Sequence, residues 1–103
     1  MSSNAIRIEE SQERFVVTPT MEVSSEHIVL FKDAAKLVKQ QKEIIIDLSQ
    51  VRMLNSTGIG VLLLFREELG LPDGTIQIHG VNETIKKLLH WASLDQMFVI
   101  KER

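Results

Sequence analysis

The sequence predicts a single α/β domain over residues 1–103, with a mixed, mostly parallel sheet of four to five strands and helices packed against it. Strand-like segments alternate along the chain with amphipathic segments that have helical periodicity. Residues Glu43–Leu48 include three consecutive isoleucines, which is typical of a central strand covered on both faces. A chain of 103 residues with 44% hydrophobic and 25% charged residues is also the size and composition of one ordinary globular domain.

The first part of the chain predicts two short strands and then a helix. Residues 5–8 and 14–17 are the strand candidates, and Pro19 is expected to end the second because proline cannot donate a hydrogen bond to a neighbouring strand. A helix is expected from an N-cap at Ser24 or Ser25 to about residue 41. Its buried face is predicted from apolar residues at helical spacing, namely Ile28, Phe31, Ala35 and Val38.

The rest of the chain predicts a further alternation of strands and helices. A helix from about Ser56 to Leu69 follows the isoleucine strand, and Gly70 is expected to end it. Residues 75–79 alternate as a strand should, residues 81–92 form an amphipathic helix, and residues 97–100 form a last strand. Two further expectations concern side chains: Trp91 is expected to be partly buried, and the histidines to lie at surface or half-buried positions, namely His27, His79 and His90.

Charge and composition exclude several classes of function. A formal net charge of -2 predicts no basic surface for nucleic acid, and the absence of cysteine removes thiolate chemistry and cysteine-based zinc sites. The histidines have no second ligand three or four residues away, so we expect no metal site. Gly58 and Gly60 match neither a Rossmann nor a P-loop spacing, and we expect no cofactor. The N-terminus lacks the pattern of a signal peptide, and the apolar run at residues 59–65 is too short to span a membrane. We therefore expect a cytoplasmic protein without membrane insertion.

The segment from Asp47 to Gly60 carries the functional signal. Two adjacent hydroxyl residues, Ser56 and Thr57, stand where the loop after the isoleucine strand enters a helix. A helix N-terminus presents unpaired N–H groups and the positive end of the helix dipole, so a phosphate attached there is compatible with the fold. The segment contains no histidine or lysine to activate a hydroxyl or to form a nucleotide-binding loop. It predicts a switch site on a binding module and not an enzyme active site.

This segment resembles the signature of the STAS domain, specifically that of bacterial anti-sigma factor antagonists. The family pattern runs aspartate-leucine-serine, a short hydrophobic stretch, then aspartate-serine-serine/threonine-glycine-leucine/isoleucine-glycine. Residues 47–49 and 55–60 match it, with Asn55 in place of the second aspartate. The order of predicted strands and helices extends the resemblance over nearly the whole chain, and it implies a single STAS-like domain.

The resemblance implies regulation of transcription by partner switching. Antagonists of this family bind an anti-sigma factor that is itself a serine protein kinase, and this binding frees the sigma factor. Phosphorylation of the serine after the motif aspartate ends the binding, and a serine phosphatase restores it. Carried onto this chain, the phosphorylated residue is Ser56, with Thr57 as the alternative. The implied partner-binding residues are Glu22, Asp47, Asn55, Ser56, Thr57, Gly58 and Gly60.

Other interpretations of these residues remain open. Asn55 can cap a helix but has no negative charge to orient a basic group or a metal-bound nucleotide. This favours an alternative in which the domain is a scaffold, or a subunit of a larger regulatory or transporter assembly, that phosphorylation does not switch. Ser56 can also be a simple first-turn residue, and Asp47 can simply cap a turn at the end of its strand.

Overall fold

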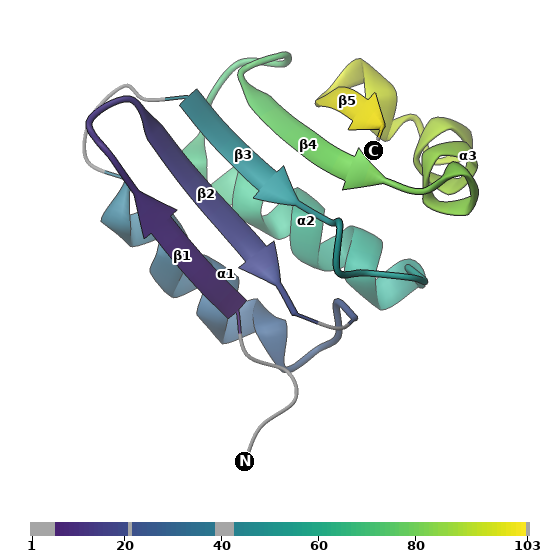
Figure 1. The fold of residues 1–103 in the computed structure, drawn as a ribbon, viewed down its shortest axis with the longest axis horizontal. Coiled ribbons are helices and arrows are strands. Elements are labelled where there is room, and N and C mark those ends of the chain that lie inside the picture. Colours follow the sequence, from purple (N-terminus) through teal and green to yellow (C-terminus); the bar gives the residue numbers. More distant parts are fainter. Residues whose placement is uncertain (1–5, 21, 39–42, 103) are drawn as a thin grey trace.

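A computed structural model describes residues 6–20, 22–38 and 43–102 of the chain. Its elements are β1 (Ile6–Glu10), β2 (Arg14–Pro19), α1 (His27–Leu37), β3 (Glu43–Asp47), α2 (Ser56–Leu69), β4 (Ile76–Val81), α3 (Glu83–Trp91), the short 3₁₀ helix η1 (Leu94–Gln96) and β5 (Val99–Glu102) (Figure 1). The predicted α/β class and the predicted order of strands and helices are confirmed. In the described part of the chain, no helix has the length and apolar character needed to cross a membrane.

The sheet has five strands in the order β1-β2-β3-β4-β5. β1 is antiparallel to β2, and all other neighbours are parallel. β3 is the central strand, and its three isoleucines are at most 3% exposed, as the sequence predicts. Because β2, β3 and β4 run in the same direction, their carboxyl ends meet at one edge of the sheet. The segments that lead to the three α-helices all leave from this carboxyl edge (Figure 1).

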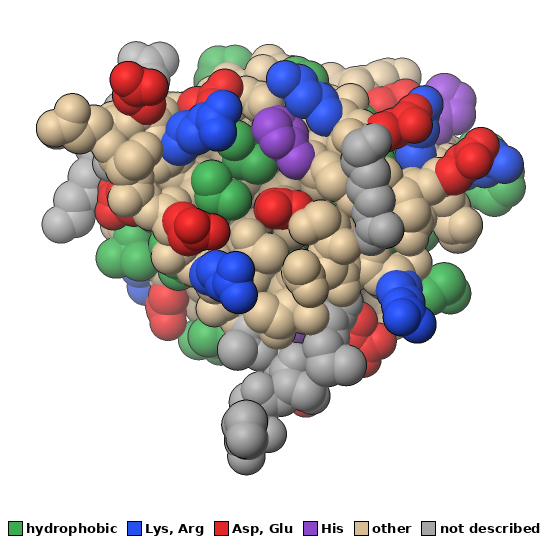
Figure 2. Space-filling view, in the orientation of Figure 1, with side chains coloured by type: hydrophobic (Ala, Val, Ile, Leu, Met, Phe, Trp, Pro, Cys, Tyr) green, Lys and Arg blue, Asp and Glu red, His purple; other side chains and the backbone are tan. Residues whose placement is uncertain are grey.

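The helices α1 and α2 lie behind the sheet in Figure 1, and the core fills the space between them and the strands. Phe31 of α1 and Phe65 of α2 pack edge to face, with ring centroids 5.5 Å apart, which joins the two helices over the core. The other face of the sheet carries a side-chain hydrogen-bonded row from Arg14 through Glu43 to Gln77. Figure 2 views this open face and shows acidic, basic and histidine side chains gathered over it.

The start of α1 differs from the prediction. The helix begins at His27, after Glu26, and neither Ser24 nor Ser25 provides a side-chain cap. Instead the Nδ1 atom of His27 accepts a hydrogen bond of 3.0 Å from the backbone N–H of Ser24. The prediction that His27 is surface-exposed or half-buried is therefore wrong, because the ring is 0% exposed.

The buried face of α1 agrees with the prediction at Phe31 and Ala35 but not at Ile28. The residues that it buries are His27, Phe31, Ala34 and Ala35. Ile28, predicted to be buried, is 37% exposed, because one residue corresponds to about 100° around a helix. The structure describes the helix to Leu37, so it ends before the predicted boundary near residue 41, and residues 39–42 lie outside the described part.

The C-terminal elements also differ in detail. Trp91 was expected to be partly buried but is 79% exposed. Leu89 is fully buried, and a residue two positions further along a helix points about 200° away from it. The last strand begins at Val99, two residues later than predicted, because η1 occupies the preceding chain and Phe98 donates its backbone N–H to the carbonyl of Leu94 at 2.9 Å.

Candidate functional site

The β3–α2 segment, residues 48–55, forms the centre of the candidate site. It leaves the carboxyl edge of the sheet with a hydrogen bond of 2.8 Å from the Leu48 N–H to the carbonyl of His79. A turn follows, closed by a bond of 3.0 Å from the Val51 N–H to the Leu48 carbonyl. Val51 and Leu54 are both buried in the core, at 0% and 6% exposure. Packing therefore holds the segment at both ends of its exposed middle.

The start of α2 is as the sequence predicts. Asn55 has an extended backbone, and its Oδ1 accepts a hydrogen bond of 2.8 Å from the N–H of Gly58. This is a side-chain N-cap, so the asparagine performs the capping function without a negative charge. Ser56 is the first residue of α2, and both Ser56 and Thr57 are exposed. The candidate hydroxyl groups thus lie at a fixed helix N-terminus and are open to solvent.

The two glycines of the motif have different surroundings. A Cβ atom at Gly58 would lie 2.5 Å from Cδ1 of Leu54 and 3.0 Å from the carbonyl oxygen of Val23. Gly58 therefore allows α2 to pack closely against the chain that leads to α1. It supports the site through this packing and is itself buried. At Gly60 no heavy atom lies within 4 Å of the same position, and the residue is exposed.

Asp47 shapes the turn after β3. Its Oδ1 accepts a hydrogen bond of 2.9 Å from the backbone N–H of Ser49. Gly80, with φ of +75°, approaches the same turn, and a Cβ there would lie 3.0 Å from Asp47 Oδ1. The observed hydrogen bond is that of a turn cap, which was one interpretation of Asp47. Asp47 therefore helps to hold the start of the β3–α2 segment in place.

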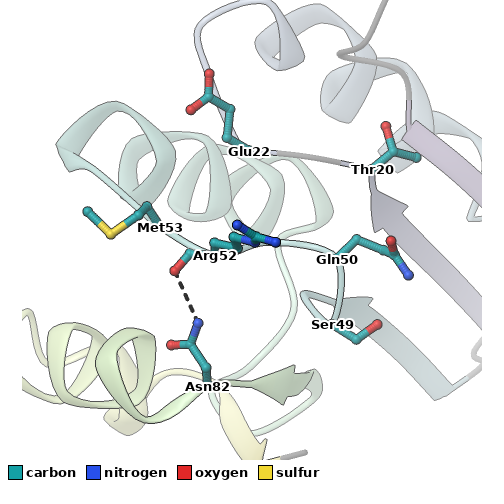
Figure 3. Close-up of a pocket in the computed structure, with 7 residues that line it drawn as sticks. All are labelled: Thr20, Glu22, Ser49, Gln50, Arg52, Met53 and Asn82. Carbon is teal, nitrogen blue, oxygen red and sulfur yellow. Dashed lines mark hydrogen bonds between the residues drawn. The ribbon is translucent and has the colours of Figure 1, made fainter.

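An open cavity of about 770 Å³ lies beside this segment at the carboxyl edge of the sheet. In open α/β sheets this edge is the usual place for a binding crevice. Its lining comes from the ends of β2 and β4 and from the β3–α2 segment, namely Thr20, Glu22, Ser49, Gln50, Arg52, Met53 and Asn82 (Figure 3). The exposed Glu22, predicted to belong to the functional surface, is brought to this cavity.

Sequence reasoning did not find Asn82, which joins two elements at this site. Its Oδ1 accepts a hydrogen bond of 2.8 Å from the N–H of Ile85 and so caps α3. Its Nδ2 donates a hydrogen bond of 3.1 Å to the carbonyl of Arg52, shown dashed in Figure 3. An asparagine before the acidic residue Glu83 is a recognisable N-cap signal, but its bond to a residue thirty positions earlier depends on the tertiary structure.

Electrostatic effects on the neighbouring open face come mainly from burial and hydrogen bonding. Burial lowers the pKa of His79, and the nearby Lys101 lowers it further. Hydrogen bonds from Gln77 and Arg14 lower the pKa of the Glu43 carboxyl. Within the described residues, no group of three or more histidine, aspartate or glutamate side chains is arranged to hold a metal ion.

Comparison with known proteins identifies the family. A family model described as the STAS domain matches residues 5–103. The chain belongs to the STAS domain family. The resemblance that the motif indicates is thereby confirmed, and the STAS domain accounts for nearly the whole chain.

Solved structures with this fold include proteins described as anti-sigma factor antagonists. The STAS domain chain shares 17% identity with an anti-sigma factor antagonist domain protein from Planctomyces limnophilus, over 95% of this chain and 90% of that one, with a TM-score of 0.77. It shares 22% identity with an anti-sigma factor antagonist from Mycobacterium paratuberculosis, over 96% and 86% of the two chains, with a TM-score of 0.74.

A third structure is the Bacillus cell fate determinant SpoIIAA in its phosphorylated form. It shares 18% identity with the STAS domain chain, over 93% of this chain and 90% of that one, with a TM-score of 0.65. At identities this low, the structural similarity to these proteins is evidence for a shared fold alone. A search of curated protein sequences gave no significant match.

Proposed function

We propose that this STAS domain is a bacterial anti-sigma factor antagonist that acts in the cytoplasm. It binds an anti-sigma factor with serine kinase activity, which frees a sigma factor, and phosphorylation of Ser56 ends the binding. The observation that carries the proposal is the position of Ser56, exposed as the first residue of α2. The Asn55 cap and the packing of Gly58 hold that helix start in place without involving the hydroxyl group.

The energetics support a switch that acts on binding and leaves the fold intact. A phosphoserine carries a charge of about −1.5 to −2. At an exposed helix N-terminus this charge gains about 0.3–1 kcal/mol from the helix dipole. In a docked interface an uncompensated buried charge costs about 3–5 kcal/mol, which weakens binding by roughly two to four decades. SpoIIAA, solved in a phosphorylated form, shows that a protein of this fold tolerates such a modification.

The proposed partner surface is the carboxyl edge of the sheet around the start of α2. Ser56, Thr57 and Gly60 form its exposed helical part, and Glu22 lies across the cavity. The other predicted members support this surface structurally: Asn55 caps the helix, Asp47 holds the turn after β3, and Gly58 lets the helix pack closely. The domain acts by binding, so no catalytic residue and no cofactor are part of the proposal.

Intact mass measurement of the protein from its native host tests the switch, with fragmentation to locate any modified residue. A species heavier by one phosphate on Ser56 supports the proposal. Phosphate on Thr57 instead would change the assignment of the modified residue by one position and leave the proposed mechanism in place. An unmodified chain in every growth condition contradicts a phosphorylation switch.

Binding to the anti-sigma factor kinases of the native host provides the functional test. Ser56→Asp is expected to weaken binding by at least about tenfold, and Ser56→Ala to retain it. Thr84→Asp is the matched control, because Thr84 is an exposed hydroxyl residue in the first turn of α3. Equal binding by Ser56→Asp and the unmodified chain contradicts the switch.

The alternative function is a STAS scaffold, or a subunit of a larger regulatory or transporter assembly. The observation that favours it is Asn55, which caps α2 but places no negative charge beside Ser56. Such a scaffold assembles equally well with Ser56→Asp, so the same binding experiment distinguishes the two functions.

A further inference from the structure

We propose that Arg52 and Met53 are the anchor of the partner-binding surface and that they receive an acidic segment of the partner protein. A carboxylate side chain of that segment enters the cavity and pairs with Arg52, and a neighbouring apolar side chain packs on Met53. The inference rests on the proposed function and names the chemistry that the anti-sigma factor kinase presents to this surface.

The backbone of the β3–α2 segment presents these two side chains rigidly. Val51 and Leu54 stand on either side of the pair and are buried in the core. Arg52 and Met53 are exposed between them, Met53 to 68%. A short loop with both flanks anchored loses little conformational entropy on binding, which favours affinity.

Asn82 completes this arrangement from the other side of the cavity. Its Nδ2 donates to the carbonyl of Arg52 at 3.1 Å, while its Oδ1 caps α3 through the N–H of Ile85 at 2.8 Å. The backbone of Arg52 is thus tied to the start of α3, thirty residues further along the chain. Asn82 is a positioning residue for the anchor.

Among the described lining residues Arg52 is the basic one and Glu22 the acidic one, so an acidic group of the partner fits at the Arg52 end of the cavity. No carboxylate among the described residues forms an ion pair with Arg52, and Figure 3 shows its guanidinium extending into the cavity while the Glu22 carboxylate points away from it. The hydroxyl and amide side chains that complete the lining are neutral, including those of Ser49 and Gln50. A guanidinium with open donors matches a carboxylate in geometry and charge.

The combination with Met53 is characteristic of a protein interface. Arginine and methionine are enriched in interface cores, and arginine is frequent among the residues that dominate binding energy. The pair is also continuous along the chain with Asn55 and Ser56. A partner seated on Arg52 and Met53 would therefore lie beside the phosphorylated hydroxyl, which explains how one phosphate can displace it.

Charge reversal tests the anchor, using the kinase whose binding Ser56→Asp weakens. Arg52→Glu is expected to lower the affinity by about tenfold or more, and Arg52→Lys by less, because lysine keeps the charge but loses the bidentate geometry. The matched control is Lys87→Glu, since Lys87 is exposed on α3 and does not line the cavity. It is expected to leave the affinity within about twofold of the unmodified chain.

The outcomes separate this inference from the function on which it rests. Unchanged affinity of Arg52→Glu for a partner that Ser56→Asp releases overturns the anchor and leaves the proposed function in place. A host without any Ser56-dependent partner overturns both. Support for an acidic partner segment requires that one Asp→Lys or Glu→Lys change in the kinase restores binding to Arg52→Glu; failure of every such change to do so overturns it.

A second variant tests the positioning role of Asn82 without the partner. Asn82→Asp keeps an oxygen to cap α3 but removes the donor to the carbonyl of Arg52. Amide hydrogen exchange at Val51, whose N–H donates to the Leu48 carbonyl, is expected to become about fivefold faster, while exchange within α3 stays unchanged. Faster exchange confined to α3, or unchanged exchange at Val51, contradicts the positioning role.

Discussion

The starts of α1 and α2 both follow strands at the carboxyl edge of the sheet but are stabilised in different ways. At α2 the residue before the helix, Asn55, supplies the cap from its own side chain. At α1 the side chains of the preceding serines do not cap the helix. Instead, Nδ1 of the buried His27 accepts a hydrogen bond from the backbone N–H of Ser24. The comparison teaches that a site can be read from sequence where its contacts are local, and that it is misread where a buried side chain replaces the expected one.

The largest expected effect is at the start of α1. His27→Ala removes a fully buried ring and leaves the Ser24 N–H without its acceptor, so the free energy of unfolding should fall by about 2–4 kcal/mol. Ile28→Ala, at a position that is 37% exposed, should lower it by less than about 1 kcal/mol. Urea denaturation of both variants measures the difference, and a larger loss at Ile28 would restore the sequence-based assignment.

The next effect separates the two glycines of α2. Gly58→Ala should lower the free energy of unfolding by about 1–3 kcal/mol, because the new Cβ meets Leu54 and the carbonyl of Val23. Gly60→Ala has open space and should raise it by about 0.5–1 kcal/mol through better helix propensity. Thermal denaturation of the pair tests this, and similar stabilities would show that the close packing at Gly58 is not needed.

The cap of α2 is expected to have a smaller effect. Asn55→Ala should lower the free energy of unfolding by about 1 kcal/mol because the Gly58 N–H loses its acceptor. Asn55→Asp should keep the cap and full stability, and it restores the acidic residue of the family pattern beside Ser56. Denaturation measures the stability, and the rate of Ser56 phosphorylation by the cognate kinase should rise in Asn55→Asp; an unchanged rate would show that this charge is unimportant.

The smallest expected effect concerns pH and the histidine at the end of β4. Burial lowers the pKa of His79 below its usual value of 6.5, so the unfolded chain binds a proton more readily than the folded one. Stability should therefore fall slightly as the pH drops below about 6.5, because the unfolded chain then binds more protons than the folded one. Urea denaturation at pH 7.5 and pH 5.5 measures this loss, and His79→Gln should reduce the difference in stability between the two pH values. If the difference is unchanged in His79→Gln, the pH dependence comes from other groups.

These comparisons show how far the candidate site can be predicted. The exposed Ser56, the Asn55 cap and the Asp47 turn follow from residues within a few positions of each other. The cavity does not, because its walls come from segments that are distant in sequence. Arg52 and Asn82 carry no special pattern around them that links one to the other, and only the adjacent placement of β3 and β4 brings them together.

The sequence by itself determined the alternation of elements, the central position of β3 and the bounds of α2. These features depend on local rules: consecutive isoleucines for a strand buried on both faces, an asparagine cap, and Gly70 in the left-handed conformation with φ of 62°. Only the tertiary structure decided that His27 is buried, that Gly58 and Gly60 have different roles, and that Asn82 holds the β3–α2 segment. Each of these depends on contacts between separate elements, and such contacts exist only once the sheet and helices have packed together.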